Sequence, residues 1–320
     1  MTMTTEDKSP QEDASPPLAN FVVPSYTPSN PRDKFAFLKW VVIGVITCFA
    51  TALVLSLWGH SRWVHGINTR LQALEAATPK THPQRYDDEE LKNLPPVVRR
   101  YLSQALNMYQ PIVRGLYMEQ SGTVNLSMQT EQWEPFTARQ RVATKRPGFV
   151  WDASIATPYG ISMRVVDAYV AGVGSLQPSL MGLLDVGGSH GTGDIARGEL
   201  IRHFAESVWY PTALLPSQGV LWKAVDAQTA QATLTDGPQT VTLLFTFNAD
   251  GLVERISSAE RSALVNGVMV PIPWEVRLSS YQRHSGMLVP QEAEVAWLAP
   301  SGRMPYWRGK LEKLDYDMPR

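Results

Sequence analysis

The chain has 320 residues, a formal net charge of −1 and 44% hydrophobic residues, enough to bury a sizeable core. The balanced charge excludes the strongly basic surface of nucleic-acid-binding proteins, so we expect no nucleic acid as a partner. The only cysteine, Cys48, lies in an apolar segment, which excludes disulfides and a thiolate metal site in the rest of the chain. Nucleotide, dinucleotide and zinc motifs are missing as well, so we predict neither a cofactor nor a metal.

Residues 1–34 are predicted to be a disordered tail. Prolines are scattered there among serine, threonine and acidic residues, with no apolar periodicity. Such a segment cannot bury enough apolar surface to offset its ordering entropy.

The stretch from Trp40 to Gly59 contains no charged residue. As a helix it is roughly 30 Å long, which matches the hydrocarbon thickness of a bilayer, and Trp40 and Trp58 suit its two interfaces. A buried core helix is the alternative, but core helices seldom run this long without a charge. A cleaved signal peptide is disfavoured, because the apolar run is long and Arg62 follows where a small-residue cleavage site would stand. We therefore expect one transmembrane helix within residues 35–60.

Basic residues flank this segment unequally. Arg32, Lys34 and Lys39 precede it, whereas Arg62 and Arg70 follow it. By the positive-inside rule, this difference of one charge favours a cytoplasmic N-terminus and an extracytoplasmic C-terminal domain.

Residues 61–90 are predicted to be a stalk and linker between the membrane and the domain at 91–320. Ile67, Leu71 and Leu74 have helical spacing, and the helix should end before Pro79 because proline restrains its predecessor from helical angles. A polar segment then leads into the domain.

The domain begins with a helix and continues with strands. Val98, Tyr101, Leu102, Ala105 and Leu106 form an apolar stripe at helical spacing. From about residue 114 the period shifts toward two, and Gly and Pro mark turns. The strands are expected at 114–128, 135–145, 148–156, 160–172, 221–227, 231–236, 239–248, 252–261, 273–284 and 290–299. Because strands follow strands without helices between them, we predict an α+β fold with an antiparallel sheet.

The strand at 239–248 shows the alternation most clearly. Val241, Leu243, Phe245 and Phe247 are expected to point to one face and the residues between them to the other. The three residues that follow Asn248 are predicted to form a compact hairpin loop, with Gly251 in the left-handed conformation.

A second helix is predicted from about Asp194 to Tyr210. Ile201, Phe204, Ala205, Val208 and Trp209 lie on one face, and the opposite face carries Glu199, Arg202, His203 and Glu206. This polar face is typical of a solvated surface with pairs at i, i+4 spacing. The alternative is a polar network in which Glu199, Arg202 and Glu206 reach into a groove and pair with Arg or Asp on the sheet. Asp167 is the sheet residue that we assign to this network.

Several motifs resemble an uncharacterised bacterial family of unknown function. They are W-x-P-F-x-A-x-Q at 133–140, F-x-W-x-A at 149–153, D-x-Y-x-x-G-x-G at 167–174, G-E-L-x-R at 198–202, A-E-x-x-W-x-P-T-A-L-L at 205–215 and P-W-E at 273–275. The resemblance covers roughly residues 94–316 and implies no activity. Its strand order is similar to the LolA and LppX type of lipoprotein carrier, which implies a curved antiparallel half-barrel around an apolar cavity covered by a few helices. Unlike those carriers, this chain lacks a lipobox and is expected to stay tethered in a bacterial inner membrane with a periplasmic domain.

Residues 187–191 spell the G-x-S-x-G motif of the nucleophile elbow of α/β-hydrolases. That chemistry requires Ser189 on a strand-to-helix turn above a parallel sheet, followed by an acid and a histidine. The surrounding strands look antiparallel and glycines crowd the loop, so a flexible loop is favoured over a hydrolase site. We therefore lean toward a protein without enzymatic activity.

Aromatic side chains are frequent in and beside the expected strands. They include Trp222 and Trp307 and the residues that we predict to bind ligand, Trp151, Tyr169, Trp209, Trp274, Tyr281 and Trp297. Each one alone could simply pack in the core, but together they are typical of an apolar pocket. The leading hypothesis is a membrane-tethered domain that binds a lipid or other hydrophobic ligand. The alternative is a non-catalytic interaction module with an envelope protein as its partner, marked by an exposed apolar patch and no cavity.

Overall fold

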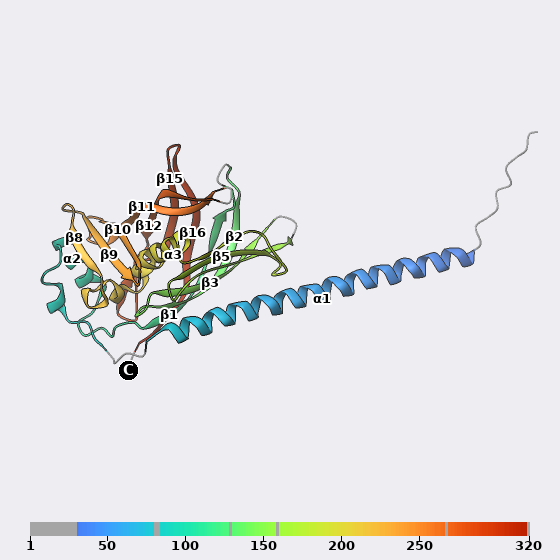
Figure 1. Ribbon diagram of the computed structural model, residues 1–320, viewed down its shortest axis with the longest axis horizontal. Coiled ribbons are helices and arrows are strands. Elements are labelled where there is room, and N and C mark those ends of the chain that lie inside the picture. Colours follow the sequence, from blue (N-terminus) through green and yellow to red (C-terminus); the bar gives the residue numbers. More distant parts are fainter. Residues whose placement is uncertain (1–30, 80–83, 128–129, 158–159, 266–267, 319–320) are drawn as a thin grey trace, which may run out of the picture. The chain divides into compact units, whose positions relative to one another are not determined.

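The computed structural model describes residues 31–79, 84–127, 130–157, 160–265 and 268–318 (Figure 1). From Leu53 onward the chain forms one compact unit. Residues 1–30, which make up most of the predicted tail, lie outside the described residues.

The first helix, α1, runs without a break from Pro31 to Ala77 and ends two residues before Pro79. Its segment from Phe35 is, by length and composition, apolar enough to cross a membrane. Large apolar side chains such as Phe49 and Val54 are exposed along it.

The other helices are short, and strands make up most of the chain beyond them. The α-helices are α2 (Pro96–Ala105) and α3 (Asp194–Ala205), and 3-10 turns lie at Asp88–Leu91, Glu206–Trp209, Pro211–Leu214 and Pro216–Gln218. The strands of the N-terminal half are β1 (Gly115–Asn125), β2 (Trp133–Ala143), β3 (Gly148–Ala156), β4 (Ser162–Val170), β5 (Val173–Leu180), β6 (Leu184–Asp185) and β7 (Ser189–Gly191). Those of the C-terminal half are β8 (Leu221–Ala224), β9 (Thr229–Asp236), β10 (Gln239–Phe247), β11 (Val253–Val265), β12 (Val268–Ser279), β13 (Gln282–His284), β14 (Met287–Val289), β15 (Glu292–Ala299) and β16 (Gly302–Asp317).

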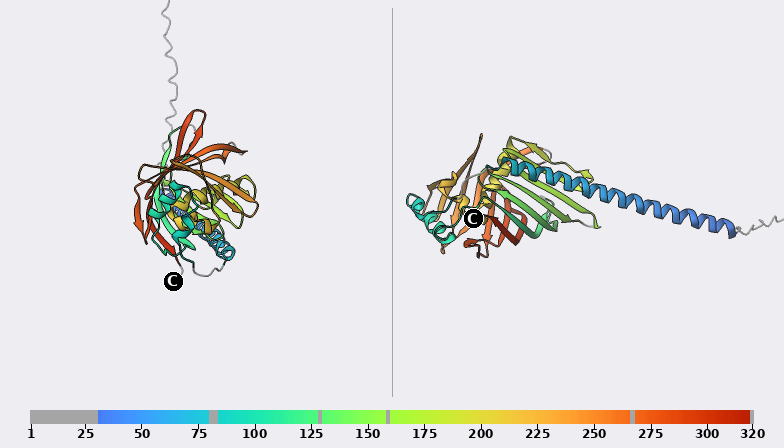
Figure 2. Two further views of the ribbon diagram at one scale, coloured as in Figure 1. Left: turned by 90° about the vertical axis from the view of Figure 1, so that its left-hand side faces the viewer. Right: turned by 90° about the horizontal axis from the view of Figure 1, so that it is seen from below.

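One antiparallel sheet contains nearly all of these strands, in the order β6-β5-β4-β3-β2-β1-β16-β15-β12-β11-β10-β9-β8, with β7 paired to β5. It curls around α3 as a half-barrel (Figures 1 and 2). The predicted α+β class with a curved antiparallel sheet and a few covering helices is therefore confirmed.

Strand β16 joins the two halves of the sheet, and the sequence patterns did not predict it. It pairs with β1 on one side and β15 on the other, from Gly115↔Asp317 to Ala299↔Gly302. None of its side chains is fully buried, although several of its apolar residues pack against the core. A bulge near Leu311 interrupts the alternation of these apolar residues, so the strand shows no continuous period of two to detect.

The concave face of the sheet and the helices share one core. Val241, Leu243, Phe245 and Phe247 are all buried, which confirms the predicted alternation along β10. Helix α2 buries Val98, Tyr101, Leu102 and Ala105, as its stripe predicts. The expected hairpin after Asn248 is also present, with Gly251 at φ +84°.

Several strand predictions were wrong in detail. Strands β5, β6 and β7 were missed because small and polar residues interrupt the apolar pattern there. The strand predicted at 273–284 breaks after Ser279, where Ser280 takes a φ of +58°, and a separate hairpin of β13 and β14 follows.

The last part of α1 packs against the outer face of the sheet. Trp63 and Leu74 are buried in a small second core with Val150 and Val166 of β3 and β4. The indole Nε1 of Trp63 donates a hydrogen bond to Asp152 Oδ1 at 2.8 Å. The helical part of the segment predicted as a stalk is thus fixed to the domain by side-chain packing.

Candidate functional site

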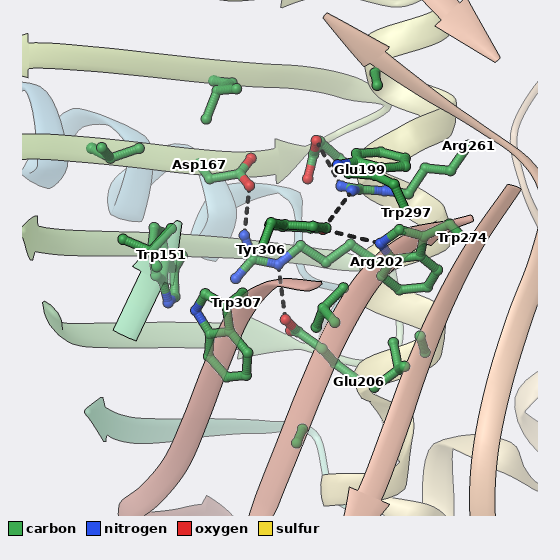
Figure 3. Close-up of a pocket in the computed structure, with 18 of the residues that line it drawn as sticks. Trp151, Asp167, Glu199, Arg202, Glu206, Arg261, Trp274, Trp297, Tyr306 and Trp307 are labelled. Atoms are coloured by element: carbon green, nitrogen blue, oxygen red, sulfur yellow. Dashed lines mark hydrogen bonds and ion pairs between the residues drawn. The ribbon is translucent and has the colours of Figure 1, made fainter. Parts of the chain in front are cut away.

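A cavity of about 380 Å³ lies between the concave face of the sheet and helix α3. Most of its wall is apolar, with Ile155, Met163 and Val165 from one half of the sheet and Val276 and Val295 from the other. Its size and lining are those of a small-molecule binding site. A group of charged side chains interrupts the apolar wall at α3 (Figure 3).

Arg202 of α3 is the centre of this charged group. Its Nη1 lies 2.5 Å from Asp167 Oδ2 on β4, and its Nε lies 2.8 Å from Glu206 Oε1. Glu206 also accepts a hydrogen bond from Gln140 Nε2 at 2.6 Å. Burial lowers the pKa of Arg202, but the carboxylates of Glu206, Asp167 and Glu199 outweigh it and raise that pKa above its ordinary value. Arg202 is therefore a permanent cation.

Arg261 of β11 is a second buried cation in the wall. Its three nitrogens contact Glu199 Oε1 at 3.4 Å, the Gly198 carbonyl at 3.1 Å and the Tyr306 hydroxyl at 3.2 Å. The Tyr306 hydroxyl also accepts a hydrogen bond from Trp274 Nε1. These bonds tie helix α3 to strands β11, β12 and β16.

Aromatic rings cover both guanidinium groups. Arg202 lies 4.9 Å from the ring centres of Phe149 and Trp151, and Arg261 lies 5.1 Å from Trp274 and 5.5 Å from Trp297. Cation–π contacts of this kind gain strength when they are desolvated. The aromatic residues therefore shield the charged group from solvent, and Trp151, Trp274 and Trp297 also line the pocket (Figure 3).

Glu199 balances the charge of the cluster. Asp167, Glu199 and Glu206 supply three carboxyl groups against the two guanidinium groups of Arg202 and Arg261. Burial, and after it the Asp167 carboxylate, raise the pKa of Glu199 well above its ordinary value, although Arg261 and Arg202 oppose this shift. A proton on Glu199 makes the cluster neutral and allows a hydrogen bond to Asp167, which satisfies the otherwise unpartnered Asp167 Oδ1 and Glu199 Oε2.

Replacing Glu199 with glutamine is expected to flatten the pH dependence of stability. Because the pKa of Glu199 is raised on folding, the folded state holds a proton that the unfolded state loses above the ordinary pKa of 4.5. The free energy of unfolding therefore falls as pH rises toward the folded-state pKa, by at most about 1.4 kcal/mol per pH unit. Glu199→Gln keeps the hydrogen-bond donor and cannot titrate, so this decline should disappear.

The measurement is the guanidinium midpoint of tryptophan fluorescence, recorded for the full chain in micelles from pH 6.5 upward. This range avoids His203, whose pKa burial lowers to about 3 and whose own effect on stability lies below pH 6.5. Glu260→Gln, on an exposed position of β11, is the control and should follow the wild type. A Glu199→Gln curve parallel to the wild type would show that Glu199 is already ionised in the folded state.

Four of the six aromatic residues predicted to bind ligand line the pocket, namely Trp151, Trp209, Trp274 and Trp297. Tyr169 and Tyr281 lie outside its lining. Tyr169 is buried in the core with its hydroxyl on Asp236, and Tyr281 donates to the Val253 carbonyl. All four residues of the predicted polar network, Asp167, Glu199, Arg202 and Glu206, contribute to the pocket wall. Their role in binding a ligand stays a prediction.

The solvated surface expected for the polar face of α3 was wrong. Glu199, His203 and Glu206 are buried, because the sheet curls around the helix and covers both of its faces. Glu199 pairs with Arg261 on β11, so the expected i, i+4 pair with His203 does not form. The ring of His203 instead packs beside Tyr210.

Arg261 was missed because a bulge reverses the alternation of β11. Ser258 pairs with Trp274 and Arg261 pairs with Ile272, so β11 advances by three residues where β12 advances by two. Ile256 and Ser258 are buried before the bulge, whereas Arg261 and Ala263 are buried after it. A bulge of this kind turns a side chain to the other face of a sheet, and strict period-two counting cannot detect it.

The structural context of the G-x-S-x-G motif contradicts a nucleophile elbow. Ser189 opens the short strand β7, which pairs antiparallel with β5, and α3 starts only at Asp194. The parallel sheet and the tight strand-to-helix turn that such an elbow needs are not formed at this position. Where the sequence predicts a flexible loop, the structure has the short edge strand β7, which borders the pocket.

Comparison with known proteins adds a family assignment. The curated proteins give no match. Among solved structures, the chain is similar to a LolA superfamily protein from Nitrosomonas europaea, with a TM-score of 0.32 and 10% identity over 78% of this chain and 94% of that one. It is also similar to a beta-barrel-like protein of domain of unknown function DUF1849 from Brucella abortus, with a TM-score of 0.23 and 11% identity over 64% and 98% of the two chains. The model of DUF6920, a family of unknown function, matches residues 92–316, and the chain therefore belongs to that family.

Proposed function

We propose that this protein is a single-pass membrane protein whose half-barrel domain holds a lipid or another hydrophobic ligand. The observation that carries the proposal is the cavity of about 380 Å³, with its apolar wall and its one charged group. Polar groups in such a site fix the orientation of a ligand, while the apolar wall supplies most of the affinity. The presence of a cavity also favours ligand binding over a pure interaction module, for which an exposed apolar patch would be sufficient.

Helix α1 is the proposed anchor, with the span at Trp40–Gly59, the N-terminus in the cytoplasm and the domain on the periplasmic side of a bacterial inner membrane. The basic residues before the span support this orientation. A fusion of alkaline phosphatase to the C-terminus should therefore be active. An inactive phosphatase combined with an active cytoplasmic reporter at the same point would contradict the orientation.

Filling the cavity should abolish ligand binding. Ala263 of β11 is buried and lines the pocket, so a phenylalanine at this position would occupy ligand space. We expect the full-length wild type to retain a stoichiometric lipid in native mass spectrometry and to bind a lipid with a fluorescent acyl chain. Ala263→Phe should lose the adduct and bind the probe at least about tenfold more weakly, a loss of roughly 1.4 kcal/mol.

Ala224→Phe is the matched control, because Ala224 lies at an exposed position of β8. It should bind the probe like the wild type. If Ala263→Phe folds and keeps the same lipid adduct, the lipid is bound outside the cavity and the proposal is wrong.

A further inference from the structure

Exposed apolar side chains gather at one edge of the half-barrel. They come from four hairpins, β1–β2, β3–β4, β5–β6 and β11–β12. These hairpins turn at the same edge because their strands are antiparallel and because β16 and β15 connect β1 to β12 in register. We call this set the apolar rim, and its members are Leu126, Ile161, Met181, Leu184, Val186 and Val268.

One part of the apolar rim is attached to the end of the predicted membrane span. Gly59, the last residue of the span, packs so closely on the β5–β6 turn that an added Cβ would lie 2.7 Å from Leu183 Cγ and 2.8 Å from the Met181 carbonyl oxygen. Gly182 makes the reciprocal contact, with its own Cβ position 2.8 Å from the Gly59 carbonyl oxygen. Side chains at either glycine would separate the helix from the turn.

Arg62 strengthens the same attachment. Its Nη1 donates to the carbonyls of Gly182 and Leu183 at 3.3 and 2.8 Å, and its Nη2 lies 2.7 Å from Asp185 Oδ2. Arg62 follows Gly59 by roughly 4.5 Å along the helix axis. The β5–β6 hairpin, in which Leu184 of β6 is 62% exposed, is therefore held within about one helical turn of the point where the apolar span ends.

The cavity extends to this edge. Leu126, which is 40% exposed in the apolar rim, also lines the cavity, and so do Met163 near the start of β4 and Met269 near the start of β12. Asp167 lies four residues further along β4 than Met163, which places the charged group roughly 13 Å deeper along the strand. The apolar wall thus runs from the rim toward the charged group at α3.

We propose that the apolar rim docks onto the surface of the bilayer that holds α1, so that a lipid can pass between the membrane and the cavity without crossing water. This inference rests on the proposed membrane anchor and ligand-binding function. The bilayer is the occupant because the β5–β6 part of the rim is fixed within about one helical turn of the point where the predicted span ends. Apolar side chains at that level gain free energy by entering the boundary between headgroups and acyl chains.

The test labels single cysteines that are introduced after the chain's own cysteine, Cys48, has been replaced. In a Cys48→Ser background, Leu184→Cys and Val268→Cys place a nitrobenzoxadiazole fluorophore on the rim, and Leu221→Cys places it on the exposed edge strand β8 as a control. The full chain is inserted into nanodiscs whose lipids carry nitroxide groups on their acyl chains. Fluorophores at 184 and 268 should shift to shorter wavelength and lose most of their emission, while the fluorophore at 221 should keep it. Equal emission at all three positions would overturn docking.

Probe binding in the same nanodiscs separates this inference from the proposed function. If the fluorescent lipid binds but the rim labels are not quenched, docking is wrong and ligand binding stands. If the rim labels are quenched but no lipid binds, docking stands alone.

The variant Leu184→Asp with Val186→Asp adds a kinetic test. It should take up the lipid from vesicles several-fold more slowly and bind lipid delivered by cyclodextrin with unchanged affinity. Unchanged uptake from vesicles would contradict a role of the rim in transfer.

Discussion

Arg202→Met is expected to destabilise the domain by about 3–5 kcal/mol, the usual cost of removing one partner from a buried ion pair. The guanidinium of Arg202 is bonded to both Asp167 and Glu206, and both carboxylates are buried. Without it, Arg261 is left as the one cation of the cluster, facing three carboxyl groups. A buried, uncompensated carboxylate is costly because water no longer solvates it. The readout is the guanidinium midpoint of tryptophan fluorescence for the full chain.

A triple variant distinguishes loss of charge balance from loss of packing. Adding Asp167→Asn and Glu206→Gln to Arg202→Met removes the two carboxylates that Arg202 had paired with, leaves Glu199 to balance Arg261 and should recover most of the lost stability. Arg139→Met, at an exposed position of β2, is the control and should stay within about 0.5 kcal/mol of the wild type. If the free energy of unfolding of Arg202→Met stays within about 1 kcal/mol of the wild type, the carboxylates are solvated and the cluster is not sealed from water.

Trp63→Ala is expected to release the end of α1 from the sheet at a cost of about 3–5 kcal/mol, as for other large buried side chains. The variant loses the hydrogen bond to Asp152, the cation–π contact with Arg164 at 5.6 Å and the packing on Val150 and Val166. Backbone amides of residues 61–77 should then exchange their hydrogens at least about 100-fold faster, since 1.4 kcal/mol corresponds to a factor of ten. Hydrogen exchange with mass spectrometry of the full chain measures this rate.

Two further variants make the result specific. Trp63→Phe keeps the aromatic packing and loses the indole donor, so its loss should be about 0.5–1.5 kcal/mol, the net contribution of one hydrogen bond. Val64→Ala, at the neighbouring exposed position, should leave exchange unchanged. Unchanged exchange in Trp63→Ala would mean that the helix does not depend on this contact.

The same packing has a consequence for expression, because a domain that begins at residue 80 would expose the apolar patch that Trp63 and Leu74 cover.

The sequence alone determined the features that depend on local patterns. The uncharged run from Trp40 to Gly59 predicts a helix of membrane-spanning length, and the apolar stripe from Val98 to Leu106 predicts α2. The alternation in β10 predicts a strand with one buried face. These features follow from spacing along the chain, because helices and strands each impose a fixed period on side-chain direction.

Tertiary structure decided the features that depend on long-range register and curvature. The curl of the sheet buries the polar face of α3, which spacing alone would place in solvent. The bulge in β11 turns Arg261 into the pocket, and pairing with β1 makes β16, which has no fully buried side chain, a central strand. The packing of Trp63 on β3 brings together residues 89 positions apart. None of these contacts leaves a local period in the sequence, so only the folded chain shows that the charged residues of α3 and β11 meet in one apolar cavity.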